Sequence, residues 1–336
     1  MSEVATAALR EALAREGLLV GTQGTLPETI AAISDDSRRA GPDSCFVAVR
    51  GALRDGHDFL PQVEAGRASA TACAIAPPPL CPTSTTPGGR VSTTALPAFI
   101  VRETRAAAAA AAAAFYGEPA QALQLVGVTG TNGKTTTVGL LRHLLDAPET
   151  PSASIGTLGV LLGDGSPFPG GSGLTTPGPI ELQRVLRALV DAGVRRVAME
   201  VSSHALDQQR VGGLRFAAGV FTNLTRDHLD YHGTMDAYFA AKAKLVDLIA
   251  DDGCVVTNAD DAAWSRLPQG RRRLRFGLDA DADVRADALR YTPRGSAWLL
   301  RQGEQSRPVA LPLIGDFNVA NALAAAAAAL AVGVPF

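Results

Sequence analysis

Cysteine is scarce in this sequence, and neither sign of charge dominates it. The four cysteines among 336 residues form no C-x-x-C pair, which suits reduced thiols in a cytoplasm. The formal net charge is only -2, so the composition gives no electrostatic footprint for nucleic acid. The first residues show no secretory signal pattern. These absences favour a cytoplasmic protein that does not bind nucleic acid.

Long hydrophobic runs are also missing. The alanine stretch at 106–114 is bounded by Arg105 and by Phe115-Tyr116-Gly117-Glu118, which leaves it too short to span a bilayer. It predicts a helix, and we expect no membrane insertion. A chain of 336 residues with 46% hydrophobic content can bury two cores, so its length favours two domains.

An apolar run at 125–129 leads into Gly130-Thr131-Asn132-Gly133-Lys134-Thr135-Thr136, followed by a helical pattern through Leu145. This order predicts a phosphate-binding loop, because the two glycines allow a tight turn whose amides, with the helix N-terminus, surround phosphate oxygens. Lys134 would neutralise the β- and γ-phosphates, and the Thr135 hydroxyl would bind Mg²⁺. The spacing is G-x-x-G-K-T and departs from the standard pattern, because Val128 stands where the first glycine is expected. A tight turn with a surface lysine therefore remains the alternative.

Strands alternate with helical stretches after Leu123, which predicts a parallel sheet covered by helices on both faces. The expected strands are 125–129, 194–201, 216–222, 253–258 and 274–278. The stretch 284–312 is more typical of antiparallel strands, and 317–332 of a final helix. Ligands of such sheets bind at the carboxyl ends of the strands, so the residues that follow each strand are candidates for the site.

Short strands and turn residues make up the first hundred residues. We expect a helix at 3–15, a strand at 45–49 and a flexible Pro-, Ser-, Thr- and Gly-rich excursion at 77–97. The segment Ser34-Asp35-Asp36-Ser37-Arg38 is a surface turn or a binding loop. With a boundary near residue 103, the predicted fold is α/β: a small N-terminal α/β domain at 1–103 and a central P-loop ATPase domain, with a mainly parallel sheet flanked by helices, at 104–336.

Two predicted strands are followed by polar residues. Glu200 ends one strand at the edge that holds the phosphate loop, and its carboxylate suits Mg²⁺, although it could also cap a helix. His228 and His232 follow another strand at i and i+4, a spacing that invites a zinc site. Gly233 argues against a continuous helix there, so we expect one histidine near a magnesium site or a structural role.

The helix that begins after Thr234 carries a lysine on its apolar stripe. Lys242 lies at helical spacing from Tyr238, Phe239 and Leu245, whereas Lys244 points elsewhere. A buried lysine is costly unless it loses its proton, and a neutral amine can react with carbon dioxide to give a carbamate able to bind a metal. The alternative is a side chain that extends its ammonium to water.

Asn318 and Asn321 open the final helix of the sequence. They lie three residues apart and share a helix face, where their amides could pair with the edge of an adenine base. Helix capping explains them equally well at this stage.

Together these motifs resemble the Mur ligase family. The resemblance rests on the loop 129–136, on Met199-Glu200-Val201-Ser202-Ser203-His204-Ala205-Leu206, on Thr222-Asn223-Leu224 through Gly233, on Lys242, and on 315–321. Leu174-Thr175-Thr176-Pro177 and Asp36-Ser37-Arg38 are most similar to the members that add the third peptide residue in peptidoglycan precursor synthesis. The similarity covers nearly the whole chain.

The resemblance implies a role for each matching residue. It makes 130–136 the ATP loop, Glu200 and His228 magnesium ligands beside Thr135, and Lys242 a carbamylated lysine that binds metal, with Lys134, Lys242 and His228 as catalytic residues. The residues implied to hold the muramoyl dipeptide are Thr175, Thr176, Ser202, Gln208 and Arg210. Ser37 would contact the uridine nucleotide, and Asn318 and Asn321 the adenine.

The resemblance also implies an ATP-dependent amide ligase acting on UDP-N-acetylmuramoyl-L-alanyl-D-glutamate through an acyl phosphate, with lysine or meso-diaminopimelate as the incoming diamino acid. Cofactors would be ATP, Mg²⁺ and the carbamate on Lys242, and we expect a monomer. Family members carry a third domain that closes over ATP and selects the amino acid. That domain would begin where this sequence stops, so we expect a chain that binds its substrates but ligates poorly.

Two other functions remain open at this stage. A related amide ligase of the folylpolyglutamate or cyanophycin type would share the phosphate loop but not the Ser37 segment. A non-catalytic nucleotide-binding module would keep the loop and would not need Glu200 or Lys242.

Overall fold

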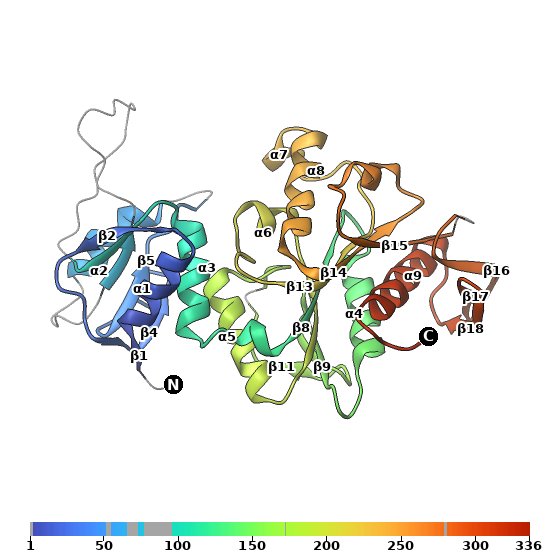
Figure 1. The fold of residues 1–336 in the computed structure, drawn as a ribbon, viewed down its shortest axis with the longest axis horizontal. Helices are drawn as coiled ribbons and strands as arrows, with labels where there is room; N and C mark the ends of the chain where they lie inside the picture. The colour runs from blue at the N-terminus through green and yellow to red at the C-terminus, as the bar shows by residue number, and fades with distance from the viewer. Residues whose placement is uncertain (1–2, 52–54, 66–72, 77–95, 172, 279–280) are drawn as a thin grey trace. The chain divides into compact units, whose positions relative to one another are not determined.

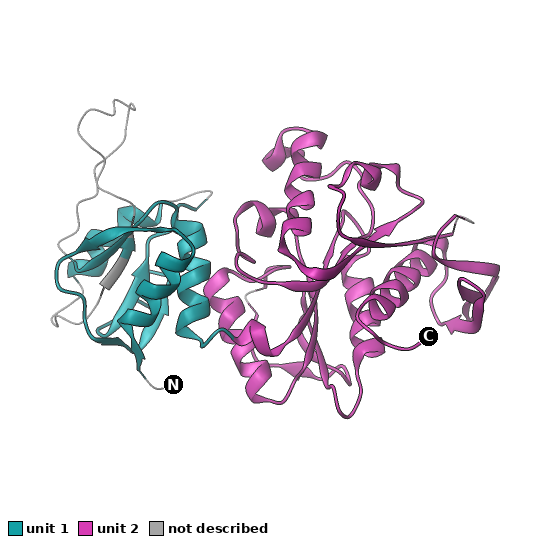
Figure 2. Ribbon diagram, viewed as in Figure 1, with its two compact units in different colours: residues 1–118 teal, residues 119–336 magenta. Residues whose placement is uncertain are grey.

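Two compact units, 1–118 and 119–336, make up the computed structural model (Figure 2). The structure describes residues 3–51, 55–65, 73–76, 96–171, 173–278 and 281–336, so most of the excursion expected at 77–97 lies outside the described residues. The units divide after Glu118 and not near residue 103, because helix α3 (Thr104–Phe115) packs against α1 (Thr6–Arg15) within the first unit.

The first unit is built on a five-stranded sheet with the order β2-β7-β6-β5-β4, in which only β2 runs antiparallel to its neighbour. Helix α1 begins at Thr6 and not at Glu3, because the residues before it pair with β3 as a short strand. The strands of this unit are β1 (Val4–Ala5), β2 (Leu19–Gln23), β3 (Thr29–Ile30), β4 (Ala32–Ser34), β5 (Ser44–Val47), β6 (Cys73–Ala76) and β7 (Ala98–Val101), and its other α-helix is α2 (Leu60–Ala65), all among the described residues.

The second unit contains a sheet of eleven described strands, ordered β11-β10-β9-β12-β8-β13-β14-β15-β16-β17-β18. The central strands from β9 to β16 run parallel, which confirms the expected parallel sheet. Strands β16, β17 and β18 pair antiparallel, as expected for 284–312. The strand bounds are β8 (Gln124–Thr129), β9 (Ser152–Gly156), β10 (Gly159–Leu162), β11 (Pro167–Phe168), β12 (Arg196–Glu200), β13 (Phe216–Phe221), β14 (Ile249–Asn258), β15 (Arg272–Gly277), β16 (Val284–Thr292), β17 (Gly295–Gln302) and β18 (Gln305–Leu311).

Helices cover both faces of this sheet (Figure 1). Their bounds are α4 (Lys134–Leu145), α5 (Pro179–Asp191), α6 (Ser203–Asp207), α7 (Leu229–His232), α8 (Met235–Ala243) and α9 (Asp316–Ala331). On one face α4 and α9 pack over Val126 and Val128, and on the other α5, α6 and α8 pack over Leu125. Alternate residues of β8 therefore enter different cores, as expected for a strand that is buried on both faces.

The order of these elements brings the ends of β8, β9, β12 and β13 together at one edge of the sheet. The helix after Thr234 is shorter than its apolar stripe suggested, because it continues as a 3-10 turn (Lys244–Leu248) and Ile249 starts β14. Within the described ranges, none of the helices combines the length and apolarity that a bilayer crossing requires.

Candidate functional site

The predicted phosphate loop connects β8 to α4, with Lys134 as the first helical residue. Gly130 and Gly133 have φ values of +149° and +85°, which side chains on L-residues rarely allow. A Cβ atom at Gly130 would lie 1.9 Å from Thr222 Oγ1, and one at Gly133 would lie 2.2 Å from Asn321 Oδ1. The loop thus needs glycine for its conformation and for the close approach of two neighbouring side chains.

Polar contacts fix the loop to the segment after β13. The amide of Asn132 donates to Asn223 Oδ1 at 2.9 Å, and the carbonyl of Asn132 accepts from Thr222 Oγ1 at 2.7 Å. Thr131 donates its amide to Asn223 O at 2.7 Å, and its hydroxyl accepts from the amide of Thr225 at 3.0 Å. Contacts between residues about ninety positions apart therefore hold the loop open toward the strand ends.

Lys134 and Lys242 meet at one backbone carbonyl. Lys134 Nζ donates to Gly130 O at 2.9 Å and to Thr131 O at 2.8 Å, and Lys242 Nζ donates to the same Gly130 O at 2.7 Å. The lysine on the apolar stripe of α8 therefore reaches the phosphate loop, 112 residues away in the sequence. An extension of Lys242 to bulk water, the alternative considered above, does not occur, since this side chain is 1% exposed.

Burial, together with the nearby Lys134 ammonium, lowers the pKa of Lys242 to about 6. The amine also lies 4.4 Å from the centre of the Tyr238 ring, whose hydroxyl is 3.3 Å from Thr131 Oγ1. Burial lowers the pKa of Lys134 as well, although the carboxylates of Glu200 and Asp227 act in the opposite direction. At neutral pH the Lys242 amine is mostly uncharged, and the site holds two amines without two full positive charges.

Glu200 lies at the end of β12 and is 1% exposed. Its Oε1 accepts from Thr135 Oγ1 at 3.0 Å, so the acid and the loop hydroxyl predicted as magnesium ligands do meet. The same oxygen accepts from the amide of Thr157 at 2.9 Å, and Oε2 lies 3.3 Å from the Thr157 hydroxyl. These contacts orient the carboxylate toward the loop and argue against a helix-capping role for it.

Thr157 was missed in the sequence, although a signal was present. It follows β9 directly, and residues just after the strands of such a sheet are the candidates for a site. Its hydroxyl also lies 3.2 Å from that of Thr175, so Thr157 connects Glu200 to the Leu174-Thr175-Thr176-Pro177 segment. Gly156 before it is required as well, because a Cβ there would lie 2.3 Å from Glu200 Oε1.

The oxygen atoms of Thr135 and Glu200 suit Mg²⁺, which takes hard ligands and usually keeps several waters or phosphate oxygens. No group of three His, Cys, Asp or Glu residues able to hold a metal ion occurs among the residues that the structure describes. A magnesium ion held by one carboxylate, one hydroxyl and a triphosphate needs no such group.

His228 precedes α7 in a left-handed conformation, with φ of +51°, which costs an L-residue about 1–2 kcal/mol. Its ring centre lies 6.2 Å from that of Tyr238, the ring that also contacts Lys242. The expected break at Gly233 is confirmed, since α7 ends at His232. His232 Nε2 lies 3.0 Å from Ser203 Oγ, and the rings of both histidines lie near those of His204 and Tyr238.

Four of the residues matched to dipeptide binding form one hydrogen-bonded group. Thr176 Oγ1 donates to Glu200 O at 2.9 Å and accepts from the amide of Ser202 at 3.0 Å. Arg210 Nη1 donates to Thr176 O at 3.0 Å, and Arg210 Nη2 donates to Gln208 Oε1 at 2.7 Å. Thr175 contacts this group through Thr157. All five predicted residues are therefore connected to Glu200, directly or through neighbouring hydrogen bonds.

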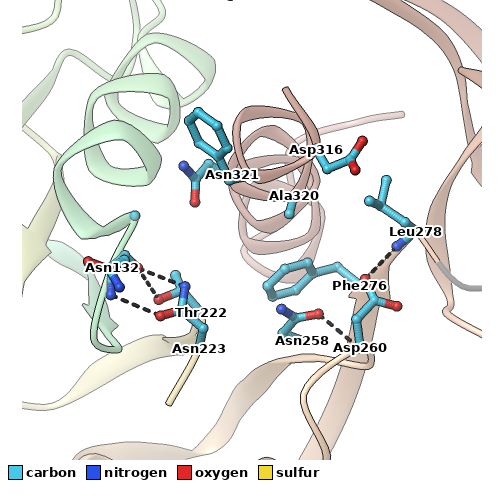
Figure 3. A pocket seen from close by; sticks show the side chains of 12 residues that line it. Asn132, Thr222, Asn223, Asn258, Asp260, Phe276, Leu278, Asp316, Ala320 and Asn321 are labelled. Atoms are coloured by element: carbon cyan, nitrogen blue, oxygen red, sulfur yellow. Dashed lines mark hydrogen bonds between the residues drawn. The ribbon is translucent and has the colours of Figure 1, made fainter. Parts of the chain in front are cut away.

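A pocket of about 540 Å³ lies beside the phosphate loop (Figure 3). Asn132, Thr222 and Asn223 lie on one side of it, and Asn258, Asp260 and Phe276 on another. Asn321 lines the pocket, whereas Asn318 is not among its described lining residues and donates Nδ2 to Ile314 O at 2.9 Å. The two asparagines thus differ: Asn318 is directed to the carbonyl of Ile314 before the helix, with no side-chain cap on α9 among the described residues, and Asn321 lines the pocket.

In the first unit, Ser37 lies in a turn held by its neighbours. Asp36 Oδ1 accepts from the Arg38 amide at 3.1 Å and from Arg38 Nε at 2.9 Å. The hydrogen bond from the Arg38 side chain lowers the pKa of Asp36 to about 2. Ser34 Oγ accepts from the Asp36 amide at 3.1 Å. The half-buried Ser37 therefore lies in a turn that its neighbours hold by local hydrogen bonds.

Comparisons with known proteins agree with this geometry. The UDP-N-acetylmuramoyl-L-alanyl-D-glutamate--2,6-diaminopimelate ligase of Synechococcus elongatus is 43% identical over 91% of this chain and 60% of its own length. The protein of that name from Gloeobacter violaceus is 40% identical over 97% and 63%. A solved structure with the same name has a TM-score of 0.69 and 28% identity over 92% of this chain and 63% of that one.

The chain spans about three fifths of the length of these relatives. The MurF structure from Acinetobacter baumannii has the same fold at 22% identity, with a TM-score of 0.67 over 100% of this chain and 66% of that one. Residues 128–329 match the model of the Mur ligase middle domain. This chain belongs to the Mur ligase family.

Proposed function

We propose that this chain provides the ATP and UDP-muramoyl-peptide sites of an ATP-dependent ligase acting on UDP-N-acetylmuramoyl-L-alanyl-D-glutamate in peptidoglycan precursor synthesis. The observation that carries the proposal is the convergence of Lys134, Lys242 and Glu200 on one loop, through Gly130 O and Thr135 Oγ1. The relatives named for 2,6-diaminopimelate support a diamino acid as the incoming amine. They also favour this reading over a folylpolyglutamate-type ligase.

In this proposal the phosphate loop and Lys134 hold the triphosphate. The amides of 130–133 and the start of α4 point at the phosphates, and Lys134 exchanges its carbonyl partners for phosphate oxygens. Thr135 and Glu200 hold Mg²⁺, which neutralises charge on the transferring phosphoryl group when it is bound. Asn321 pairs with the adenine base from the 540 Å³ pocket, while Asn318 stays bonded to Ile314 O.

Lys242 is proposed to carry a carbamate. Its pKa of about 6 leaves the amine uncharged at neutral pH, so its lone pair can form a bond to the carbon of carbon dioxide and release a proton. The modified side chain would present carboxylate-like oxygens beside the phosphate loop, with His228 as a second donor near Tyr238. Both would then hold a second magnesium ion.

Thr175, Thr176, Ser202, Gln208 and Arg210 are proposed to hold the muramoyl dipeptide, and Ser37 the uridine nucleotide. The arginine is suited to an acidic peptide because its planar guanidinium pairs with carboxylates. The D-glutamyl carboxylate would take the γ-phosphoryl group to form an acyl phosphate, and the amine of the diamino acid would displace phosphate. We further propose that the chain is a monomer in the cytoplasm.

Calorimetric titration tests the proposal. The chain should bind ADP in the presence of Mg²⁺. In a separate titration, it should bind UDP-N-acetylmuramoyl-L-alanyl-D-glutamate more tightly than UDP alone. Folate is the control ligand, and preference for folate would favour the other amide ligase. For a form that ligates, wild-type rates after Lys242→Ala or Glu200→Ala would support a non-catalytic module. Restoration of Lys242→Ala by short-chain carboxylic acids would support the carbamate.

A further inference from the structure

A second lysine at the end of α8 starts a chain of hydrogen bonds that leads to the proposed dipeptide site. Lys244 Nζ donates to Asp207 Oδ1 at 2.8 Å, and the Tyr231 hydroxyl donates to Asp207 Oδ2 at 2.9 Å. Gln208 Nε2 donates to the Tyr231 hydroxyl at 3.3 Å, and Gln208 Oε1 accepts from Arg210 Nη2 at 2.7 Å. Arg210 then reaches Thr176 O.

In this series of hydrogen bonds, the donor and the acceptor of each bond are fixed. Arginine can only donate, so the Gln208 side chain must turn its oxygen toward Arg210 and its amide nitrogen toward Tyr231. The Tyr231 oxygen therefore accepts, and its own proton must go to the Asp207 carboxylate, which as an anion can only accept. Asp207 is thus the fixed end point for donors on both sides.

Burial alone would raise the pKa of Asp207, but the hydrogen bonds from Lys244 and Tyr231 outweigh it and lower that pKa. The carboxylate consequently stays ionised at neutral pH. The Lys244 and Asp207 side chains are 48% and 36% exposed, so their ion pair by itself contributes little to the stability of the fold. Its effect should instead appear where the chain of hydrogen bonds ends, at Gln208 and Arg210.

We propose that Asp207, Tyr231 and Lys244 are positioning residues that hold Gln208 and Arg210 in the geometry that receives the acidic substrate peptide. The inference rests on the proposed function, since it takes these two residues as the dipeptide contacts. Lys242 and Lys244 then have separate tasks on one short segment. The first reaches the phosphate loop, and the second sets the side chains beside Thr176.

Isosteric variants of the full 336-residue chain test the inference. Asp207→Asn keeps the volume of the side chain but replaces one carboxylate oxygen with an amide nitrogen. That nitrogen must face Lys244 or Tyr231, both of which donate, so one of the two hydrogen bonds to residue 207 is lost. In Tyr231→Phe the ring contact with His204 is kept and only the hydroxyl is lost. Calorimetry should show affinity for UDP-N-acetylmuramoyl-L-alanyl-D-glutamate reduced about tenfold in each. Affinity for ADP should change less than twofold.

The matched control is Asp236→Asn on α8, which breaks the exposed ion pair between Asp236 and Arg266. It should leave both affinities unchanged. Lys244→Met should weaken dipeptide binding, and Lys244→Arg should restore most of it, because the arginine still donates to Asp207. Wild-type dipeptide affinity in both Asp207→Asn and Tyr231→Phe would overturn the inference.

A different result would identify a failure of the proposed function. If the wild-type chain bound ADP but not the dipeptide, the substrate assignment would be wrong. The crystal structure of Tyr231→Phe would then still decide the positioning role, since Gln208 and Arg210 should leave their wild-type positions. Unchanged side chains there would contradict it.

Discussion

Two polar loops in this chain, the Ser34–Arg38 turn of the first unit and the phosphate loop of the second, are held in contrasting ways. Hydrogen bonds between residues two positions apart hold the first, and its Arg38 side chain is 82% exposed. The second is held by residues 90 to 112 positions away, among them the fully buried Lys242. Beyond the strand residue Ser34, the first loop is held by contacts within itself, whereas the second depends on side chains from other elements.

This contrast teaches where single substitutions should matter. A loop built from local hydrogen bonds loses only the contact that is removed, because neighbouring residues and water compensate. A loop formed by buried, distant side chains has no such freedom, so a change of one atom displaces several partners. The predictions below rank substitutions by this difference.

The largest effect is expected for Gly130→Ala. The new methyl group would lie 1.9 Å from Thr222 Oγ1 at a backbone φ of +149°, so the loop must move. We expect a loss of about 3 kcal/mol in the free energy of unfolding and of more than 100-fold in ADP affinity. Urea unfolding and calorimetry measure both.

Gly139→Ala is the matched control, because a Cβ at this position on α4 meets no atom within 4 Å. It should stabilise the helix by about 0.5–1 kcal/mol and leave ADP affinity unchanged. Equal behaviour of the two alanine variants would remove the contrast between the loops.

A smaller, pH-dependent effect is expected for Lys242→Met. The folded pKa of Lys242, about 6, lies below its ordinary value of 10.5, so between these values the unfolded chain binds the extra proton. Stability therefore rises with pH in the wild type, by about 1.4 kcal/mol per pH unit from this group. The variant lacks this pH dependence. Its free energy of unfolding, relative to that of the wild type, should therefore increase as pH falls from 8.5 to 6.5.

Urea unfolding in buffers free of carbon dioxide at those two pH values checks this prediction. Lys244→Met is the control, since that side chain is 48% exposed and should show no comparable pH-dependent difference. A constant difference between wild type and Lys242→Met across the range would mean that the amine is not desolvated.

Asn321→Ala should lower ADP affinity about tenfold, because its amide lines the 540 Å³ pocket and lies against Gly133. Asn318→Ala should lower it by less than threefold, since its amide is directed to Ile314 O. Titration of each variant with ADP tests the order. A larger loss for Asn318→Ala would show that Asn318 leaves Ile314 O when the nucleotide binds.

The smallest effect should come from Ser37→Ala in the first unit. We expect UDP affinity to fall a few-fold, with no resolvable change in the melting midpoint or in ADP affinity, because the turn is held by Asp36 and Ser34 and not by Ser37. Differential scanning calorimetry and UDP titration provide the measurements. A substantial drop in melting midpoint would mean that the turn depends on Ser37.

The sequence predicted the features that depend on local spacing. The glycines of the phosphate loop follow one strand directly, the strands alternate with helical stretches, and the apolar stripe around Lys242 has helical spacing. The contacts of Thr157 with Glu200, and of Asn321 with Thr137, join residues 43 and 184 positions apart. The place of Thr157 after a strand marks it as a candidate, but the sequence does not name its partner. The division after Glu118 was missed for the same reason, since α3 is assigned by its packing on α1.

The shared carbonyl of Gly130 has a consequence for how tightly a nucleotide can bind. A triphosphate that reaches the loop must take Lys134 away from two backbone oxygens, so its arrival is an exchange of partners and not a simple addition. A phosphate oxygen adds to the hydrogen bond an attraction between opposite charges that a neutral carbonyl lacks, so the exchange favours polyanions. Uncharged mimics of the phosphate chain should gain almost nothing from this lysine.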